Sequence, residues 1–142
     1  MVADASAGMV RVAQQRIETA GLRDRLRAVQ ADLSTDQIEG RYDVAWSSMA
    51  LHHVHDVDAL LHSIARLLVD GGRLAVADLD ADPGGAFHAD KAGFDGHDGF
   101  DRHQLAEQLT RAGFVDVSFV DATTITKHER EFGLFLCTAT KG

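Results

Sequence analysis

The sequence is poor in cysteine and in basic residues. Its single cysteine, Cys137, excludes a disulfide within the chain and favours a reducing, cytoplasmic setting. Only 14 Lys and Arg residues stand against 22 Asp and Glu residues, which gives a formal net charge of -8. Contact with many phosphates requires a dense lysine and arginine surface. We therefore expect no nucleic acid and no anionic membrane among the partners.

Long apolar runs are also missing. No window approaches the roughly 18 consecutive apolar residues of a membrane-spanning helix. The N-terminal residues lack the basic flank and apolar core of a signal peptide. We therefore expect a cytoplasmic protein. With 142 residues and 45% hydrophobic content, the chain is long enough for one domain, 1–142, with a real core.

Apolar spacing and capping residues predict that helices alternate with short strands. Ser6 and Gly21 bound one helical pattern, Asp56 and the pair Gly71 and Gly72 bound the clearest one, and a third runs from Asp101 to Gly113. The segment 80–100 is dense in Gly, Asp and His without a period, which predicts a long loop or lid. The predicted strands are residues 2–4, 27–33, 42–49, 73–79, 115–122 and 130–140. Alternation of this kind predicts an α/β domain with a mostly parallel sheet.

Two acids stand where predicted strands end. In a parallel sheet, ligands bind beyond the carboxyl ends of the strands, so these residues are candidates for binding. Asp4 precedes a helix, and the two oxygens of its carboxylate match the vicinal hydroxyls of a ribose. Asp32 could accept a hydrogen bond from an exocyclic amine such as that of adenine. The structural alternatives are a helix-capping role for Asp4 and a solvated turn for Asp32.

Histidines are concentrated in "HHVHD", residues 52–56, and in the segment 80–100. A neutral imidazole can accept a proton from a hydroxyl, so His53 is a candidate catalytic base. Imidazole and carboxylate ligands also suit zinc or iron, but the spacing matches no defined metal motif. We therefore assign no metal ligand, and packing or loop roles are the structural alternative.

Four stretches follow one another in a diagnostic order: "VADASAGMVRVAQQR", "VQADL", "YDVAWSSMALHHVHDVDALLHSIARLLVDGGRLAVADLD" and "AGFVDVSFVDATTITKHEREFGLFLCTATK". Together they resemble the later segments of a class I S-adenosylmethionine (SAM)-dependent methyltransferase of the small-molecule branch. The resemblance implies a three-layer, Rossmann-like α/β fold with strand order 3-2-1-4-5-7-6. It also implies a mostly parallel sheet, with one antiparallel strand near the C-terminus.

The resemblance implies SAM as the cofactor and assigns binding roles to particular residues. Asp4, with Ala5 beside it, would hold the ribose, and Met9 would pack near the adenine. Asp32, with Leu33 beside it, would contact the adenine amine. The end of the strand 42–49 would border the methionine part of SAM through Ser47, Ser48 and Met49. In that geometry His53 would lie near the transferred methyl group.

One family feature is missing from these residues: the first strand and its glycine-rich turn of the form G-x-G-x-G. That strand is central, so its loss would leave buried backbone groups unpaired, at about 1–3 kcal/mol each. The summed cost of several such groups is comparable to the whole free energy of unfolding of a domain, about 5–15 kcal/mol. We expect an N-terminally truncated domain with one of three outcomes. The chain is a fragment of a longer enzyme, the gap closes by pairing residues 1–4 with residues 43–48, or a partner supplies the strand.

The leading functional hypothesis is transfer of a methyl group from SAM to a small-molecule acceptor, in a longer or assembled form. The alternative is a non-catalytic, methyltransferase-like remnant that acts as an interaction or dimerisation module. A homodimer or a partner chain would then complete the sheet. A third and weaker hypothesis is a metal-binding protein that uses the His and Asp residues of the segment 80–100.

Overall fold

The computed structural model describes residues 1–142, which divide into two compact units, Met1–Glu39 and Gly40–Gly142. Each unit is described by itself. The single domain expected from the sequence stays a prediction. No helix of either unit is long and apolar enough to cross a membrane.

The first unit is a small βαβ arrangement. Strand β1 (Val2–Asp4) leads into helix α1 (Ala7–Thr19), and strand β2 (Ala28–Gln30) returns parallel to β1. The helix begins at Ser6, whose hydroxyl accepts a hydrogen bond from the backbone N–H of Met9 at 3.4 Å. Its buried side chains, Val10 and Ile17, lie two turns apart on one face of the helix. The predicted start of this helix and the end of the preceding strand at residue 4 are therefore confirmed.

The second unit is built on a four-stranded sheet with the order β3-β4-β6-β5. Its strands are β3 (Tyr42–Ser48), β4 (Leu68–Leu79), β5 (Phe114–Lys127) and β6 (Arg130–Lys141). Strand β4 is parallel to β3 and antiparallel to β6, and β5 pairs antiparallel with β6. The order expected for these strands, with the last strand lying inside the sheet, is confirmed. The sheet is mixed, so a mostly parallel character is not confirmed.

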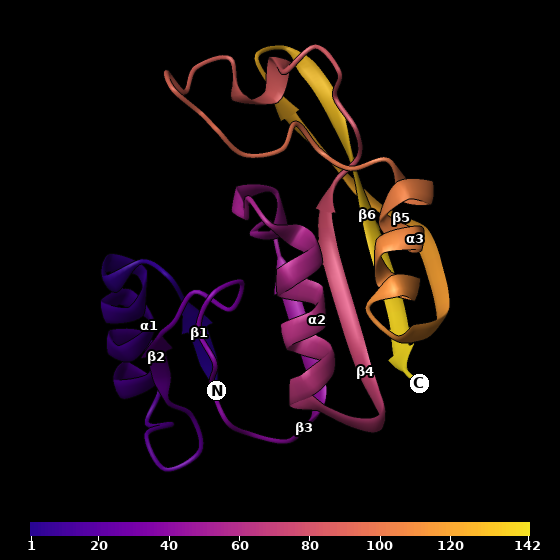
Figure 1. Cartoon of the computed structure of the whole chain (residues 1–142). Helices are drawn as coiled ribbons and strands as arrows, with labels where there is room; N and C mark the ends of the chain where they lie inside the picture. Colours follow the sequence, from indigo (N-terminus) through magenta and orange to yellow (C-terminus); the bar gives the residue numbers. More distant parts are fainter. The chain divides into compact units, whose positions relative to one another are not determined.

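Helices α2 (Val57–Leu67) and α3 (Arg102–Arg111) cover one face of this sheet (Figure 1). Both begin at a capping aspartate: Asp56 accepts from the backbone N–H of Ala59, and Asp101 accepts from those of His103 and Gln104. The core lies between the helices and the sheet. Its most buried members include Leu61, Leu68, Leu74, Leu105, Leu109, Phe114, Phe135 and Cys137. Burial raises the pKa of the Cys137 thiol to about 12, so this cysteine is an inert core residue.

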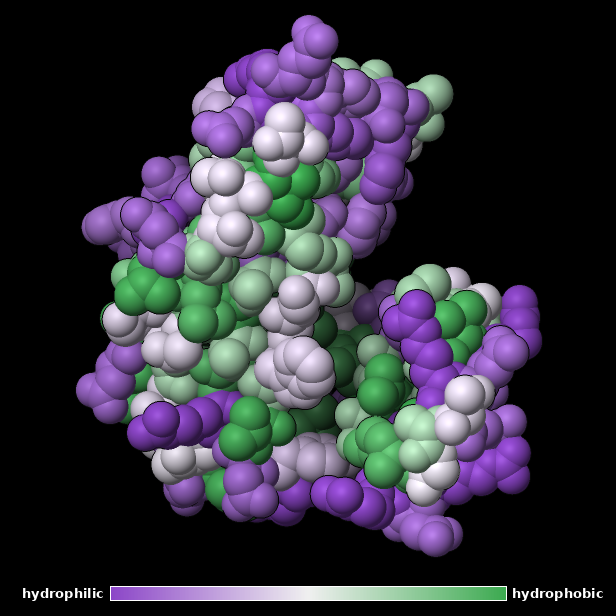
Figure 2. Space-filling model, turned by 180° about the vertical axis from the view of Figure 1, so that it is seen from behind, coloured by the Kyte–Doolittle hydropathy of each residue, from purple (hydrophilic) through white to green (hydrophobic).

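The opposite face of the sheet carries exposed apolar side chains. Ala45 packs against the core, so its neighbours in β3, Val44 and Trp46, point to the other side of the strand. They are 57% and 80% exposed, and Val120 of β5 is 53% exposed. Seen from behind, this unit shows pale and green residues between hydrophilic margins (Figure 2).

Several predicted boundaries differ from the observed ones. The clearest predicted helix, which Asp56 and Gly71 bound, ends already at Leu67, because Leu68 is fully buried and pairs with Tyr42 as the first residue of β4. Strand β2 is shorter than the predicted 27–33, and β5 is longer than the predicted 115–122 because it forms a long hairpin with β6. The segment 80–100 contains a short 3-10 turn, η2 (Ala86–His88), and Asp80 bridges Phe100.

The three outcomes expected for the missing strand stay predictions. Within the first unit β1 pairs with β2, and within the second unit β3 pairs with β4 at the end of the strand order. The open edge of β3 is thus left without a neighbouring strand in its own sheet.

Replacement of Phe135 by alanine tests the position of the core. Phe135 is completely buried between the sheet and the helices. We expect Phe135→Ala to lower the free energy of unfolding of the second unit by about 3–5 kcal/mol. The control Val120→Ala, at an exposed position, should change it by no more than about 0.5 kcal/mol. Chemical denaturation followed by circular dichroism measures both, and equal effects would contradict this core.

Candidate functional site

In the first unit, the predicted cofactor residues lie at one edge of the β1–β2 sheet. Asp4 is the last residue of β1 and is half-buried, and its Oδ1 accepts a hydrogen bond from the backbone N–H of Ser6 at 2.8 Å. Two bonds join the strand ends: the N–H of Ala31 donates to the Asp4 carbonyl, and the Gln30 side chain donates to the Ala5 carbonyl. Met9 lies on the first turn of α1 and is 54% exposed.

Asp32 follows β2 and organises a tight turn. Its Oδ1 accepts hydrogen bonds from the backbone N–H of Ser34 at 2.9 Å and from the Ser34 hydroxyl at 2.5 Å. Its own backbone N–H donates to Asp36. Leu33 is half-buried, and Asp32 is exposed. Asp4 and Asp32 therefore leave neighbouring parallel strands at the same edge, as the sequence predicts.

In the second unit, β3 ends in Ser47 and Ser48, and the chain turns at Met49. Met49 has a positive φ of 52°, a left-handed conformation that is uncommon for a residue with a side chain. Its backbone N–H donates to the carbonyl of Ala77 in β4. Strained backbone of this kind is often found at functional sites. The turn delivers the chain into the 3-10 helix η1 (Leu51–His53), which carries two of the histidines.

Asp78, near the carboxyl end of β4, anchors this turn. It is fully buried, and its Oδ2 accepts hydrogen bonds from the backbone N–H groups of Leu51 at 2.9 Å and His52 at 3.4 Å. Its Oδ1 lies 2.6 Å from Nδ1 of His52, which must donate because the carboxylate can only accept. His52 is itself 2% exposed. This pair fixes the position and the orientation of the His52 ring.

His53 is exposed and lies beside this pair. Its ring centroid is 4.2 Å from that of His52 and 5.6 Å from that of Phe94. Desolvation by its neighbours lowers the pKa of His53, and electrostatic interactions with His52, Lys91 and His88 lower it further. The imidazole of His53 is therefore neutral near pH 7 and able to accept a proton.

A second histidine–aspartate pair belongs to the segment 80–100. The His88 side chain is 2% exposed, and its Nδ1 lies 3.2 Å from Oδ1 of Asp98. The His88 ring stacks on Phe94 at 3.6 Å and lies 5.2 Å from the His52 ring. The Nε2 atom of His88 is buried and has no hydrogen-bond partner. Burial lowers the pKa of His88 despite its hydrogen bond to Asp98.

The segment 80–100 is docked onto the histidine turn. The backbone N–H of His97 donates to the His52 carbonyl at 2.8 Å, and the His97 ring lies 2.9 Å from the Val54 carbonyl. On its other side, Lys127 of β5 donates to the Phe87 carbonyl and pairs with Asp90. This ion pair is the main reason that the pKa of Asp90 is lowered. The segment is thus a fixed cover rather than a free loop.

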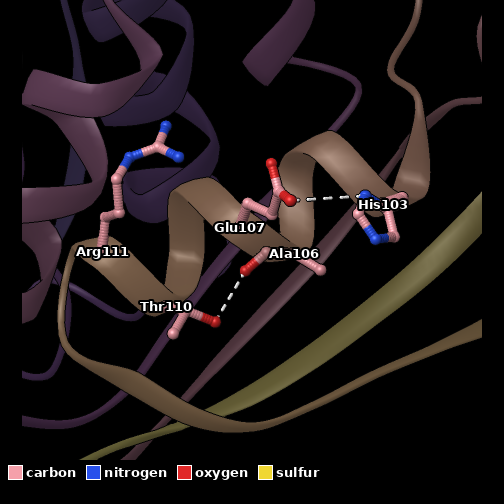
Figure 3. Close-up of a pocket in the computed structure, with 5 residues that line it drawn as sticks. All are labelled: His103, Ala106, Glu107, Thr110 and Arg111. Carbon is pink, nitrogen blue, oxygen red and sulfur yellow. Dashed lines mark hydrogen bonds and ion pairs between the residues drawn. The ribbon is translucent and has the colours of Figure 1, made fainter.

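No group of three or more His, Cys, Asp or Glu side chains is arranged to hold a metal ion. A shallow depression on α3 is lined by His103, Ala106, Glu107, Thr110 and Arg111 (Figure 3). These side chains lie along one face of a single helix. They offer one ion pair, between His103 and Glu107 at 3.6 Å, and no converging groups, so we do not regard this depression as the functional site.

The first part of the chain matches a known family. Residues 1–76 match the model of the methyltransferase domain. The chain belongs to this family. This match agrees with the resemblance to class I SAM-dependent methyltransferases described above. It is 33% identical over 78 residues to the methyltransferase GfsG of Streptomyces halstedii, a match that covers 54% of this chain and 28% of GfsG.

Solved structures share the fold. The [4+2]-cyclase SpnF has a TM-score of 0.77 at 20% identity, over 98% of this chain and 64% of that chain. Phosphoethanolamine N-methyltransferase 2 of Haemonchus contortus, solved with SAM, has a TM-score of 0.77 at 15% identity, over 98% of this chain and 42% of that chain. The chain therefore spans less than two thirds of the length of these relatives. The TM-scores confirm an α/β methyltransferase fold.

Two side-chain pairings of the site were not predicted from the sequence. The aspartate that fixes the His52 ring, Asp78, lies near the end of the predicted strand 73–79, where ligands are expected, but it carries no motif that points to a histidine 26 residues earlier. The pair formed by His88 and Asp98 lies in a segment without periodicity. The density of His and Asp residues in both segments is the signal that could have suggested these pairs.

The docking of the cover can be tested at Gly96. A Cβ atom there would collide with the His52 carbonyl oxygen. We expect Gly96→Ala to destabilise the cover by about 1–3 kcal/mol. The amides of residues 94–98 should then lose protection in hydrogen exchange. The control Gly84→Ala, where a Cβ meets nothing closer than 3.9 Å, should leave that protection unchanged. Unchanged protection in Gly96→Ala would contradict the docked cover.

Proposed function

We propose that this cytoplasmic methyltransferase-family chain moves a methyl group from SAM to a small-molecule acceptor, within a longer or assembled protein. The observation that carries the proposal is the placement of Asp4 and Asp32. Two acids follow adjacent parallel strands at one sheet edge, where α/β folds bind nucleotides. The net charge of -8 argues against a nucleic acid acceptor.

The chemistry of these side chains fits the cofactor. The Asp4 carboxylate stands at the start of α1 and can accept hydrogen bonds from both ribose hydroxyls, with Ala5 beside it. Met9 is exposed on the first turn, where it can pack on an adenine ring. Asp32 and Leu33 offer an acceptor and an apolar contact to the same base. When bound, SAM supplies an electrophilic methyl group, and the protein provides mainly alignment.

The second unit supplies the groups for the reaction itself. Ser47, Ser48 and Met49 form the end of β3 and border the methionine part of SAM in our proposal. His53 is exposed beside them and neutral near pH 7, so we assign it as the base that accepts a proton from the acceptor. The cover, residues 80–100, shapes the acceptor pocket and excludes water.

The ribose assignment predicts a loss of SAM affinity in Asp4→Ala. A hydrogen bond to a charged group contributes about 1.5–3 kcal/mol, which corresponds to a decrease of about tenfold or more. Asp4→Asn retains an acceptor for the Ser6 N–H and should show a smaller decrease. Asp24→Ala, which removes an exposed acid of the same unit, is the control. Calorimetric titration with SAM measures all three, and unchanged affinity in Asp4→Ala would contradict the assignment.

A second function, as a dimerisation module, is favoured by the open edge of β3. Antiparallel pairing of two copies of β3, centred on Ala45, would place Val44 opposite the partner's Trp46. Both apolar side chains are largely exposed, so this pairing would cover them and extend the sheet across a twofold axis. Asp43 is the one charged residue of the strand and would face a serine, so no like charges meet.

A lysine on an edge strand opposes strand pairing, so Trp46→Lys tests this second function. We expect light scattering to give the unmodified chain a mass of twice 15.4 kDa and the variant a mass of 15.4 kDa. Val115→Lys, at an exposed position of β5, should remain dimeric. A monomeric unmodified chain, or a dimer that Trp46→Lys leaves intact, would contradict the module.

A further inference from the structure

Lys91, on the cover, is the one lysine of the chain whose ammonium group forms no ion pair or hydrogen bond. The other two lysines, Lys127 and Lys141, lie 2.6 Å and 3.9 Å from carboxylate oxygens. Lys91 is exposed, and its backbone N–H donates to the His88 carbonyl at 2.8 Å, which holds it in the cover. An exposed cation without a counter-ion is available to an anion from outside the chain.

The carboxylates of the cover do not supply that anion, because each of them already has a partner. Asp80 accepts from Arg102, Asp82 accepts from the N–H of Phe87, Asp90 accepts from Lys127, Asp95 lies 3.5 Å from His55, and Asp98 lies 3.2 Å from His88. A chain with a net charge of -8 thus leaves this lysine without a carboxylate partner.

Lys91 lies close to the candidate base. Its Nζ atom is 5.7 Å from the centroid of the Phe94 ring, within the range of a cation–π contact. Phe94 in turn meets the His53 ring edge-on, at 5.6 Å between the centroids. The charge of Lys91 also acts on His53 directly, since it is one of the causes that lower the pKa of that imidazole. A cation, an aromatic ring and a proton acceptor therefore adjoin one another.

We propose that Lys91 binds an anionic group of the acceptor, such as a carboxylate, and so selects an acidic small molecule as the substrate. This inference rests on the proposed function and deepens it by naming the class of acceptor. The anionic group is separate from the atom that is methylated, which lies beside His53. Phe94 offers an apolar contact to the part of the acceptor between these two groups. A cationic acceptor would instead be repelled by Lys91 and would find the carboxylates of the cover engaged.

An anion bound at Lys91 would also change the strength of the base. Two other neighbours lower the pKa of His53 by their charge, His52 of η1 and His88 of the cover, while the Asp78 carboxylate of β4 raises it. An anion beside Lys91 offsets one of the groups that lower this pKa, so the pKa rises when the acceptor is in place. His53 is then a stronger base toward the bound acceptor than it is in the empty site.

A matched pair of small aromatic probes, benzoate and benzamide, tests the anion site without SAM. The two molecules have nearly the same shape and differ in charge. At low ionic strength we expect benzoate to shift the NMR signals of the His53 and Phe94 rings saturably and to raise the pKa of His53. It should bind about three- to fivefold more tightly than benzamide, the effect of one exposed ion pair. No saturable shift with benzoate, equal affinities for the two probes, or shifts confined to other parts of the chain would overturn the proposal.

Three variants assign the preference to the charge of Lys91. Lys91→Gln should raise the pKa of His53 in the absence of any probe, and it should abolish the preference for benzoate. Lys91→Arg retains the charge and should retain the preference. The control Lys141→Gln removes a positive charge at the end of β6 and should also retain it. A preference for benzoate that persists in Lys91→Gln, or that is lost in Lys91→Arg, would overturn the proposal.

Both probes are measured without SAM, so the result is separate from the proposed function. A chain that prefers benzoate through Lys91 and does not bind SAM would contradict the proposed function only. A chain that binds SAM and does not distinguish the two probes would contradict this inference only.

Discussion

The buried carboxylate of Asp78 is the constraint on which the second unit depends. An ionised group inside a core is costly unless each oxygen is hydrogen-bonded, and Asp78 meets this condition with the N–H groups of Leu51, His52 and Leu79 and the His52 ring. These bonds join the end of β4 to the turn after β3. The histidines of η1 are therefore held by the sheet rather than by their own short helix.

The cover follows from the same constraint. His97 and Gly96 dock on the carbonyl of His52, which Asp78 has fixed, and the ring of His88, paired with Asp98, lies 5.2 Å from the His52 ring. Arg102, at the start of α3, closes the other end of the segment by a two-pronged bond to Asp80 at 2.7 and 2.8 Å, and this bond raises the pKa of the guanidinium. An aperiodic stretch of sequence thereby becomes an ordered wall beside the candidate base.

Much of the fold could be predicted from local sequence signals. Most of the features that were predicted wrongly or not at all depend on tertiary contacts. Ser6, Asp56 and Asp101 identify the helix starts, because capping is a local interaction. The end of α2 was placed too late because the pairing of Leu68 with Tyr42 overrides helix propensity there. Asp4 and Asp32 could be placed at the same edge of the sheet from the predicted order and parallel direction of their strands alone. The partners of His52 and His88 could not, because they depend on how distant segments meet.

Binding of SAM tests the central claim most directly. A titration of the isotope-labelled chain with SAM, followed by ¹H–¹⁵N NMR, reports which amides sense the cofactor. The account predicts saturable shifts at Asp4, Ala5, Met9, Asp32 and Leu33 in the first unit, and at residues 47–53 in the second. Spectra that do not change, or shifts confined to residues elsewhere such as α3, would contradict it.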